Sequence, residues 1–149
     1  MAKFIYRMQN ILDLKEKLET QARNEYAVAQ AELNEEEDRL LSLIKRREAY
    51  EQKLAELYSG GIRVLEIQET LEAVEYMKYR IELQRHNIKK ARKKVENERA
   101  KLQFAIQERK TQDKLKENAF EVFLEELKAS ESKEIDELVS YRFGAGKEG

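Results

Sequence analysis

The side chains that most often hold metal ions are scarce in this sequence. The 149 residues include one histidine, His86, and no cysteine, so His86 has no second ligand of either type with which to share a metal ion. The acidic run Glu35–Asp38 is a conceivable cation site, but it lacks the glycine turn and alternating spacing of a calcium-binding loop. We therefore expect no metal and no cofactor, and we assign both features to solvated helix faces.

Phosphate recognition is the second chemistry to consider, because six Lys or Arg residues stand within the basic run Arg85–Lys94. Side chains at this density could contact phosphates, but the run lacks the aromatic residues that stack on bases. The sequence also lacks the GxxxxGK[ST] loop that cradles nucleotide phosphates. We therefore expect no nucleic-acid partner, and with no catalytic residue in evidence we expect the chain not to be an enzyme.

The elements that carry these side chains are predicted to be helices. The sequence is 40% charged, contains no proline, and is rich in the residues that lose least rotamer freedom in a helix. Of its five glycines, only Gly60 and Gly61 lie in the interior of the chain. We predict an all-α fold of two long helices, 2–58 and 62–143, with a turn at 59–61 and a disordered tail at 144–149. Residues 1–143 would form one domain, an antiparallel coiled-coil hairpin.

Heptad repeats predict how the two helices pair. In the second helix Ile67, Val74 and Ile81 begin a series of apolar residues that recur every seven positions up to Leu102. In the first helix, one frame places 12 apolar or aromatic residues at 16 seam positions. A hairpin that turns at Gly60 and Gly61 pairs Leu40 with Ile81 and brings the acidic run opposite the basic run. The seam positions of the first helix are Ile5, Met8, Leu12, Lys15, Glu19, Ala22, Tyr26, Ala29, Leu33, Glu36, Leu40, Leu43, Arg47, Tyr50, Leu54 and Leu57.

The second helix is predicted to extend past the first, so that residues 118–143 overhang the open end of the hairpin. This segment carries an apolar face without a predicted helical partner, which marks an interaction site or an aggregation hazard. Aromatic residues from both ends of the chain are predicted to meet there. They form either an aromatic core that stabilises the chain ends or a tip that inserts into a partner. They are Phe4, Tyr6, Phe120, Phe123, Tyr141 and Phe143.

Several motifs, in their order and spacing, resemble the flagellar export protein FliJ family over nearly the whole chain. The opening residues Phe4–Leu12 are similar to the family pattern F-x-[YF]-x-[LM]-Q-x-[VIL]-L. The Gly60–Ile62 turn follows at the expected place, and Glu134–Glu137 is similar to the family's C-terminal [LM]-D-E segment. Further matching positions are Lys15, Glu19, Leu40, Leu43, Ile44, Tyr50, Glu108, Arg109 and Lys110.

The resemblance implies a coiled coil similar to the central stalk of rotary ATPases. Its end bearing both termini would enter the hexameric ring of the flagellar export ATPase and promote ring assembly and hydrolysis. Further contacts are implied with the cytoplasmic domain of the membrane export gate and with substrate chaperones. Arg46 and Ala73 stand where aromatic residues would be expected in the gate-binding face. The residues expected to bind the ATPase ring are Phe4, Tyr6, Phe120, Phe123, Leu124 and Leu127, and those expected to bind the gate are Leu43, Tyr50, Met77 and Gln84.

The expected location is the cytoplasm, with peripheral association to the flagellar export apparatus of the inner membrane. No uncharged run exceeds six residues, whereas a membrane span needs about 20 apolar residues, so we expect no membrane insertion and no signal peptide. The free chain is expected to be an elongated monomer. Three alternatives stay open: the analogous stalk protein of a virulence type III secretion system, a homodimeric coiled-coil scaffold, and a holdase that grips unfolded chains.

Overall fold

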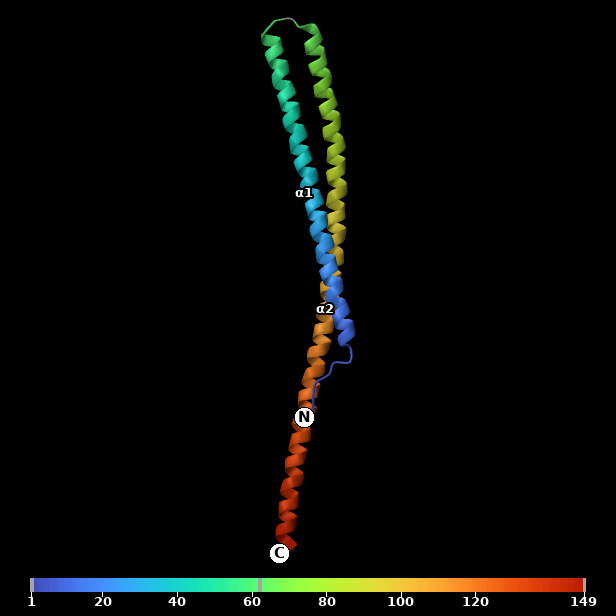
Figure 1. Ribbon diagram of the computed structural model, residues 1–149, viewed down its shortest axis with the longest axis vertical. Coiled ribbons are helices and arrows are strands. Elements are labelled where there is room, and N and C mark those ends of the chain that lie inside the picture. The colour runs from blue at the N-terminus through green and yellow to red at the C-terminus, as the bar shows by residue number, and fades with distance from the viewer. Residues whose placement is uncertain (1, 62, 149) are drawn as a thin grey trace. The chain divides into compact units, whose positions relative to one another are not determined.

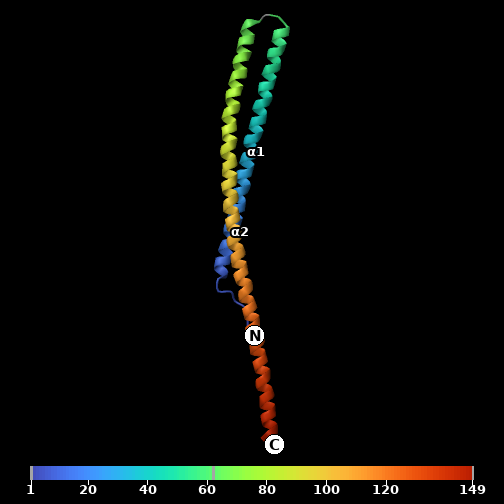
Figure 2. The same ribbon diagram turned by 180° about the vertical axis from the view of Figure 1, so that it is seen from behind.

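The computed structural model describes residues 2–61 and 63–148, and every regular element in these residues is an α-helix. Helix α1 spans Gln9–Ser59 (51 residues) and helix α2 spans Val64–Glu148 (85 residues). The two helices pack against each other as a hairpin (Figure 1; Figure 2). The predicted all-α fold of two long helices is therefore confirmed. Neither helix, over its described residues, contains a stretch apolar enough to cross a membrane.

Packing divides the chain into two compact units, each of which contains part of both helices. Unit 2, residues 21–103, holds the turn and the helix segments next to it. Unit 1 combines residues 1–20 with residues 104–149 and therefore holds both ends of the chain. The two segments of unit 1 are far apart in sequence, so tertiary contacts hold them together.

The core of unit 2 is an apolar seam between the two helices. Leu43, Met77 and Ile81 form its central cluster, with exposed fractions of 7%, 3% and 2%, and Leu40 packs against this cluster. Full burial of such a side chain contributes about 1.5–3 kcal/mol, so the seam is what holds the helices together. The predicted heptad series of α2 is confirmed from residue 74 to residue 95, where its members are buried: Val74, Ile81, Ile88 and Val95.

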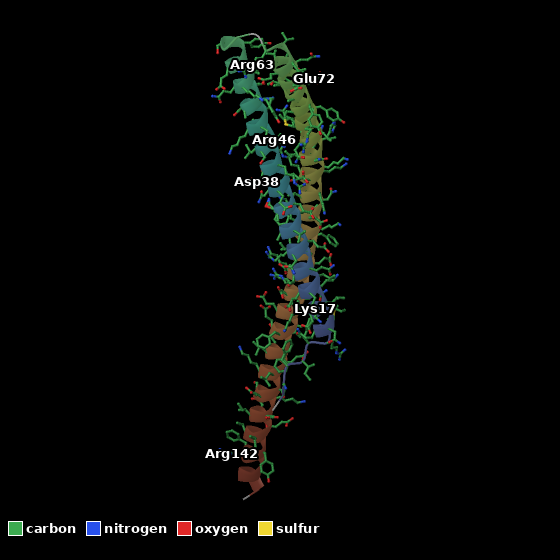
Figure 3. The ribbon with its side chains drawn as sticks, turned by 45° about the horizontal axis from the view of Figure 1, so that its top comes forward. Lys17, Asp38, Arg46, Arg63, Glu72 and Arg142 are labelled. Carbon is green, nitrogen blue, oxygen red and sulfur yellow. The ribbon has the colours of Figure 1, made fainter. Side chains whose placement is uncertain are left out.

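Charged side chains cover the faces of unit 2 that point away from the seam. Asp38, Arg46 and Glu72 are exposed there (Figure 3). Many charged residues pair with a neighbour one turn away on the same helix, as Arg85 does with Glu82 at 3.0 Å. Exposed pairs of this kind contribute at most about 1 kcal/mol each, so they keep the helices soluble more than they stabilise the fold.

The reversal between the helices depends on Gly61, whose φ of 111° is one that residues with side chains avoid. Helix α1 ends at Ser59, where the Gly60 N–H and the Ser59 hydroxyl each donate to the carbonyl oxygen of Glu56 at 3.0 Å. These bonds satisfy a carbonyl at the helix end that would otherwise lack a partner. Helix α2 begins at Val64. Its predicted start, residue 62, lies outside the described residues.

The N-terminal boundary of α1 differs from the prediction. Residues 2–8 are not helical, and α1 begins at Gln9 instead of residue 2. Ile5, which the heptad frame placed in the seam, is 76% exposed. Residues 2–6 have no regular structure and residues 7–8 form a turn, and Phe4 and Tyr6 are half-buried between exposed neighbours. This is the period of two typical of an extended chain, not the helical period.

The C-terminal boundary of α2 also differs from the prediction. The helix continues to Glu148, five residues past the predicted end at residue 143, and Gly149 lies outside the described residues. The chain contains no proline, and a glycine such as Gly144 weakens a helix by about 1 kcal/mol without breaking it. The glycines at this end were therefore an insufficient reason to end the helix.

Candidate protein-interaction surfaces

The residue types considered for metal and nucleotide chemistry lie on helix surfaces. His86 is exposed on α2, and the described residues contain no group of three or more His, Cys, Asp or Glu arranged to hold a metal ion. The last six residues, GAGKEG, match the letters GxGxxG. In a dinucleotide-binding fold that motif joins a strand to the start of a helix, whereas here residues 144–148 end α2 and Gly149 lies outside the described residues. This setting differs from that of a nucleotide-binding loop.

An aromatic cluster joins the N-terminal segment to α2 in unit 1. The Phe4 ring lies 5.1 Å from the Phe120 ring, at an interplanar angle of 69°, and 5.5 Å from the Phe123 ring. Aromatic pairs in such geometries contribute about 0.5–1.5 kcal/mol beyond the area that they bury. The Tyr6 hydroxyl donates a hydrogen bond to Oε1 of Gln112 at 3.4 Å. Four of the six residues predicted to bind the ATPase ring therefore lie on this part of unit 1.

The other predicted tip residues lie further along α2. Leu124 is 39% exposed and Leu127 is half-buried. Tyr141 and Phe143, which were predicted to join the aromatic cluster, are 78% and 71% exposed and take no part in the ring contacts of the described residues. The N-terminal segment contacts α2 around a groove of about 480 Å³ whose α2 side is Ala119, Val122, Phe123 and Glu126.

Beyond this groove α2 has no helical partner in unit 1. Every residue from 128 to 144 is exposed, including Ile135 at 60% and Leu138 at 64%. This is the overhang that the sequence predicted. Residues 118–149 include eight acidic and four basic residues, so the apolar side chains lie among negative charges. A surface of this kind complements a partner with apolar contacts and positive charge.

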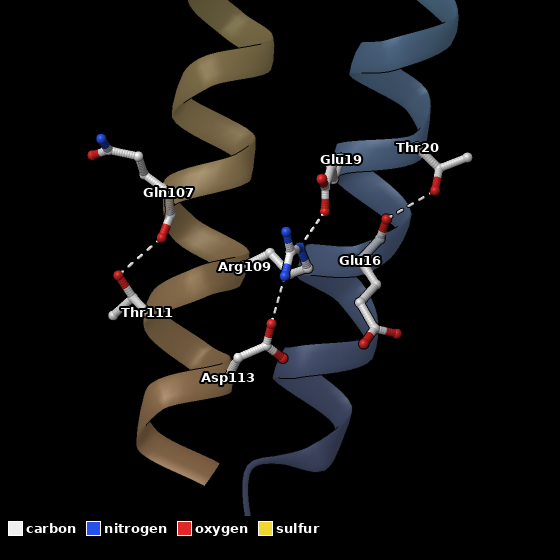
Figure 4. Close-up of polar contacts among 7 residues, drawn as sticks. All are labelled: Glu16, Glu19, Thr20, Gln107, Arg109, Thr111 and Asp113. Atoms are coloured by element: carbon white, nitrogen blue, oxygen red, sulfur yellow. Dashed lines mark hydrogen bonds and ion pairs between the residues drawn. The ribbon is translucent and has the colours of Figure 1, made fainter. Parts of the chain in front are cut away.

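A partly buried ion pair links the two helices of unit 1 (Figure 4). Glu19 of α1 is only 7% exposed, and the Arg109 guanidinium of α2 donates to its carboxylate and, at 2.6 Å, to Asp113. The hydrogen bonds from Glu19 and Asp113 raise the pKa of Arg109 above its ordinary value. Glu19 occupied a seam position of the heptad frame, but nothing in the sequence identified Arg109 as its partner. The signal in the sequence was the charge of Glu19 at a seam position, which indicates a residue of opposite charge on the facing helix.

The four residues predicted to bind the export gate lie in unit 2. Leu43 and Met77 belong to the core cluster, Tyr50 packs against it, and Gln84 is 7% exposed. The Gln84 side-chain amide donates to the backbone carbonyl of Glu36 at 2.8 Å and to its carboxylate. These positions therefore hold the two helices together. Their assignment to gate binding stays a prediction.

An exposed apolar stripe runs along α2 next to these core residues. Tyr76, Tyr79 and Leu83 are 57%, 65% and 51% exposed and are spaced by three and four residues, which places them on one helix face. The Arg80 guanidinium lies 5.9 Å from the centre of the Tyr76 ring. Sequence reasoning missed this stripe because it weighed only positions on the seam side of the helix.

Ion pairs between the helices of unit 2 agree with the predicted register to within about two turns. Glu32 contacts Lys94 at 2.9 Å and Glu37 contacts Arg92 at 3.7 Å. The acidic run therefore meets the C-terminal half of the basic run, because long basic side chains reach along the helix. The hydrogen bond and charge of Glu32 raise the pKa of Lys94.

Comparison with known proteins identifies a family. Residues 4–148 match the family described as Flagellar FliJ protein. Neither the curated proteins nor the solved structures that were compared contain a match. The match starts at Phe4, the first residue of the predicted N-terminal motif, and includes both helices. The chain is thus a flagellar export-related coiled-coil protein and belongs to the FliJ family.

Proposed function

We propose that this chain is a non-catalytic stalk of the flagellar export apparatus. It promotes the assembly and the activity of the export ATPase ring through the end of unit 1 that carries both chain ends. The observation that supports this best is the apolar surface of α2 in unit 1, where Phe120 and Leu124 are 42% and 39% exposed next to the aromatic cluster. Its acidic surroundings favour a ring surface with positive charge.

The ring is proposed to bind the end of unit 1 that carries the six tip residues. Phe120, Phe123, Leu124 and Leu127 lie on α2, and Phe4 and Tyr6 lie on the segment that packs beside them. Aromatic side chains are enriched at protein interfaces, and the leucines add apolar area that a partner can bury. The chain would act through binding alone, without a catalytic residue of its own.

A second contact is proposed with the cytoplasmic domain of the export gate. Three of the four residues predicted to bind the gate are buried in the seam, so they would hold the gate-binding face in place without touching the gate. The four are Leu43, Tyr50, Met77 and Gln84. We propose that Tyr76, Tyr79 and Leu83 make the direct contact, since they are exposed on the same helix. Escort of substrate chaperones and peripheral association with the cytoplasmic side of the inner membrane are proposed from family membership.

The experiment that tests the stalk function measures ATP hydrolysis by the cognate export ATPase, with and without the purified chain, together with hexamer formation. We expect the chain to raise both. Leu124→Ala combined with Leu127→Ala should lower the stimulation strongly, because it removes two apolar contacts. Phe104→Ala is the matched control, since Phe104 is 68% exposed in unit 1 but is not one of the six tip residues. Equal stimulation by all three proteins would refute the proposed surface.

A homodimeric scaffold is the second candidate, and the exposed side chains Ile135, Leu138 and Val139 favour it. Two such helix segments could bury these side chains against each other. Sedimentation velocity separates the two functions, because the scaffold requires a dimer whose fraction rises with concentration. The stalk function predicts a monomer in the absence of the ATPase.

A further inference from the structure

The N-terminal segment of residues 2–8, here called the strap, lies across α2 in unit 1. Phe4 and Tyr6 are half-buried, whereas Lys3, Ile5 and Arg7 are exposed. Two inward side chains thus attach an extended segment to a helix face. One contacts Phe120 and Phe123, and the other bonds Gln112.

Side chains, not backbone hydrogen bonds, hold the strap on α2. The backbone hydrogen bonds found around its end run to the first turn of α1, such as the one from the Gln9 N–H to the Tyr6 carbonyl at 3.2 Å. The Tyr6 hydroxyl bond to Gln112 is long, at 3.4 Å, and hydrogen bonds weaken at such distances. The strap is therefore attached mainly by the Phe4 ring and can detach without breaking a helix.

The helix face beneath the strap is apolar and only partly covered. Phe123 and Ala119 are half-buried, and Phe120 remains 42% exposed. The groove of about 480 Å³ between the strap and α2 ends at Glu126. A partner that binds this face would gain the area that Phe4 now covers, provided that the strap moves away.

We infer that the strap is a removable cover of the ring-binding face of α2, so that Phe4 and Tyr6 compete with the ATPase while Phe120 and Phe123 bind it. This inference rests on the proposed function and divides the six tip residues into two groups with opposite effects. The apparent affinity of a partner is reduced by the fraction of molecules whose site is closed. Removing the strap contacts of Phe4 and Tyr6 therefore raises the affinity for the ATPase. Removing Phe120 or Phe123 from the α2 face lowers it.

The test compares the binding of the cognate export ATPase to full-length variants. Phe4→Ala combined with Tyr6→Ala should tighten binding by about threefold if the strap is closed in about two thirds of the molecules. Phe123→Ala should weaken it. Ile5→Ala is the matched control, because Ile5 lines the groove on the strap but is 76% exposed, so it attaches the strap less than the half-buried Phe4 and Tyr6 do. Circular dichroism verifies that each variant keeps its helix content.

A cross-link tests the same competition in the opposite direction. The chain has no cysteine, so Tyr6→Cys and Gln112→Cys can be joined selectively by a bifunctional maleimide. The linked protein should bind the ATPase more weakly than the same protein before linking. If linking leaves the affinity unchanged, the strap does not need to open and the inference is wrong.

The outcomes separate this inference from the proposed function. If Phe4→Ala with Tyr6→Ala weakens binding as much as Phe123→Ala does, the strap residues are direct contacts, and the proposed function stands without the cover. If Phe123→Ala has no effect, the ring-binding face itself is wrong. Opening is then measured without the ATPase, as the rate at which a maleimide labels Ala119→Cys. This rate should rise when Phe4 and Tyr6 are replaced by alanine, and equal rates would refute a cover that opens.

Discussion

At the scale of single residues, Gln84 in the seam favours one register of the two helices. It is 7% exposed and donates to the Glu36 carbonyl of the other helix at 2.8 Å. Thr70, at 4% exposure, is satisfied within its own helix by the Glu66 carbonyl at 2.7 Å. A sliding helix would leave the Gln84 amide buried without its partner, at a cost of about 1–3 kcal/mol. Apolar residues alone would tolerate such a slip better, so Gln84 confers specificity.

Ile81 is the largest of the fully buried side chains among the described residues. It is 2% exposed and lies in the central cluster. Ile81→Ala should lower the free energy of unfolding by about 2–5 kcal/mol, because it removes buried methyl groups and leaves a cavity. Urea denaturation measures this loss. Leu41→Ala, at a residue that is 56% exposed, should change the free energy of unfolding little, and an equal loss in both variants would contradict the assigned core.

Lys94 gives a pH-dependent test of the register. Glu32 raises its pKa above 10.5 through a hydrogen bond and charge. A pKa raised by folding contributes stability that is fully present below pH 10.5 and is lost as the pH rises through the folded-state pKa. Lys94→Gln should therefore lower the urea midpoint slightly at about pH 8, and this deficit should shrink as the pH rises through the folded-state pKa of Lys94. Lys93→Gln, at the neighbouring exposed position, is the control. A deficit that persists at high pH would exclude this ion pair as its cause.

At the scale of elements, the turn and the strap show two ways in which a helix boundary is set. The turn is set by its own residues, because Gly61 adopts a φ of 111° that few other residues tolerate. The start of α1 is decided by distant contacts: residues 2–8 contain no proline or glycine, yet they are not helical and place the Phe4 ring against α2. Contacts with a distant segment override a weak helical preference.

The turn glycine allows a direct comparison of two substitutions. Gly61→Ala should lower the free energy of unfolding by about 1–3 kcal/mol, because an L side chain is strained at this φ. Gly144→Ala should raise local helix stability by about 0.5–1 kcal/mol, because an added Cβ meets nothing within 4 Å there and alanine favours the helix. Thermal denaturation measures the first effect, and hydrogen exchange near residue 144 the second. Equal effects at both positions would mean that the turn conformation is not constrained.

At the scale of the whole molecule, the two units have separate tasks in the proposed function. Unit 2 contains the closed apolar seam, and unit 1 contains the open aromatic and leucine surface. A truncation that removes residues 118–149 should abolish stimulation of the export ATPase, because it removes all α2 residues of the proposed surface. The remaining chain should stay helical, since the seam of unit 2 is untouched. Steady-state hydrolysis and circular dichroism measure the two results, and stimulation that survives the truncation would remove this surface from the mechanism.

Sequence by itself determined the helices, the turn and the apolar seam, because these depend on local preference and on a period that can be counted along the chain. The series Val74, Ile81, Ile88 and Val95 and the glycine pair carried that information. The family followed from ordered motifs in the same way.

Only the tertiary structure decided which side chains are buried in the seam between the helices and which are exposed on the surface. Met77 and Gln84, predicted to bind the gate, are buried, while Tyr76 and Tyr79 beside them are exposed. A one-residue step turns a helix by about 100°, so only the position of the partner helix decides which of these neighbouring side chains is buried. The strap and the pair of Glu19 with Arg109 likewise join residues some 90 or more positions apart, and no local pattern specifies a contact at that distance.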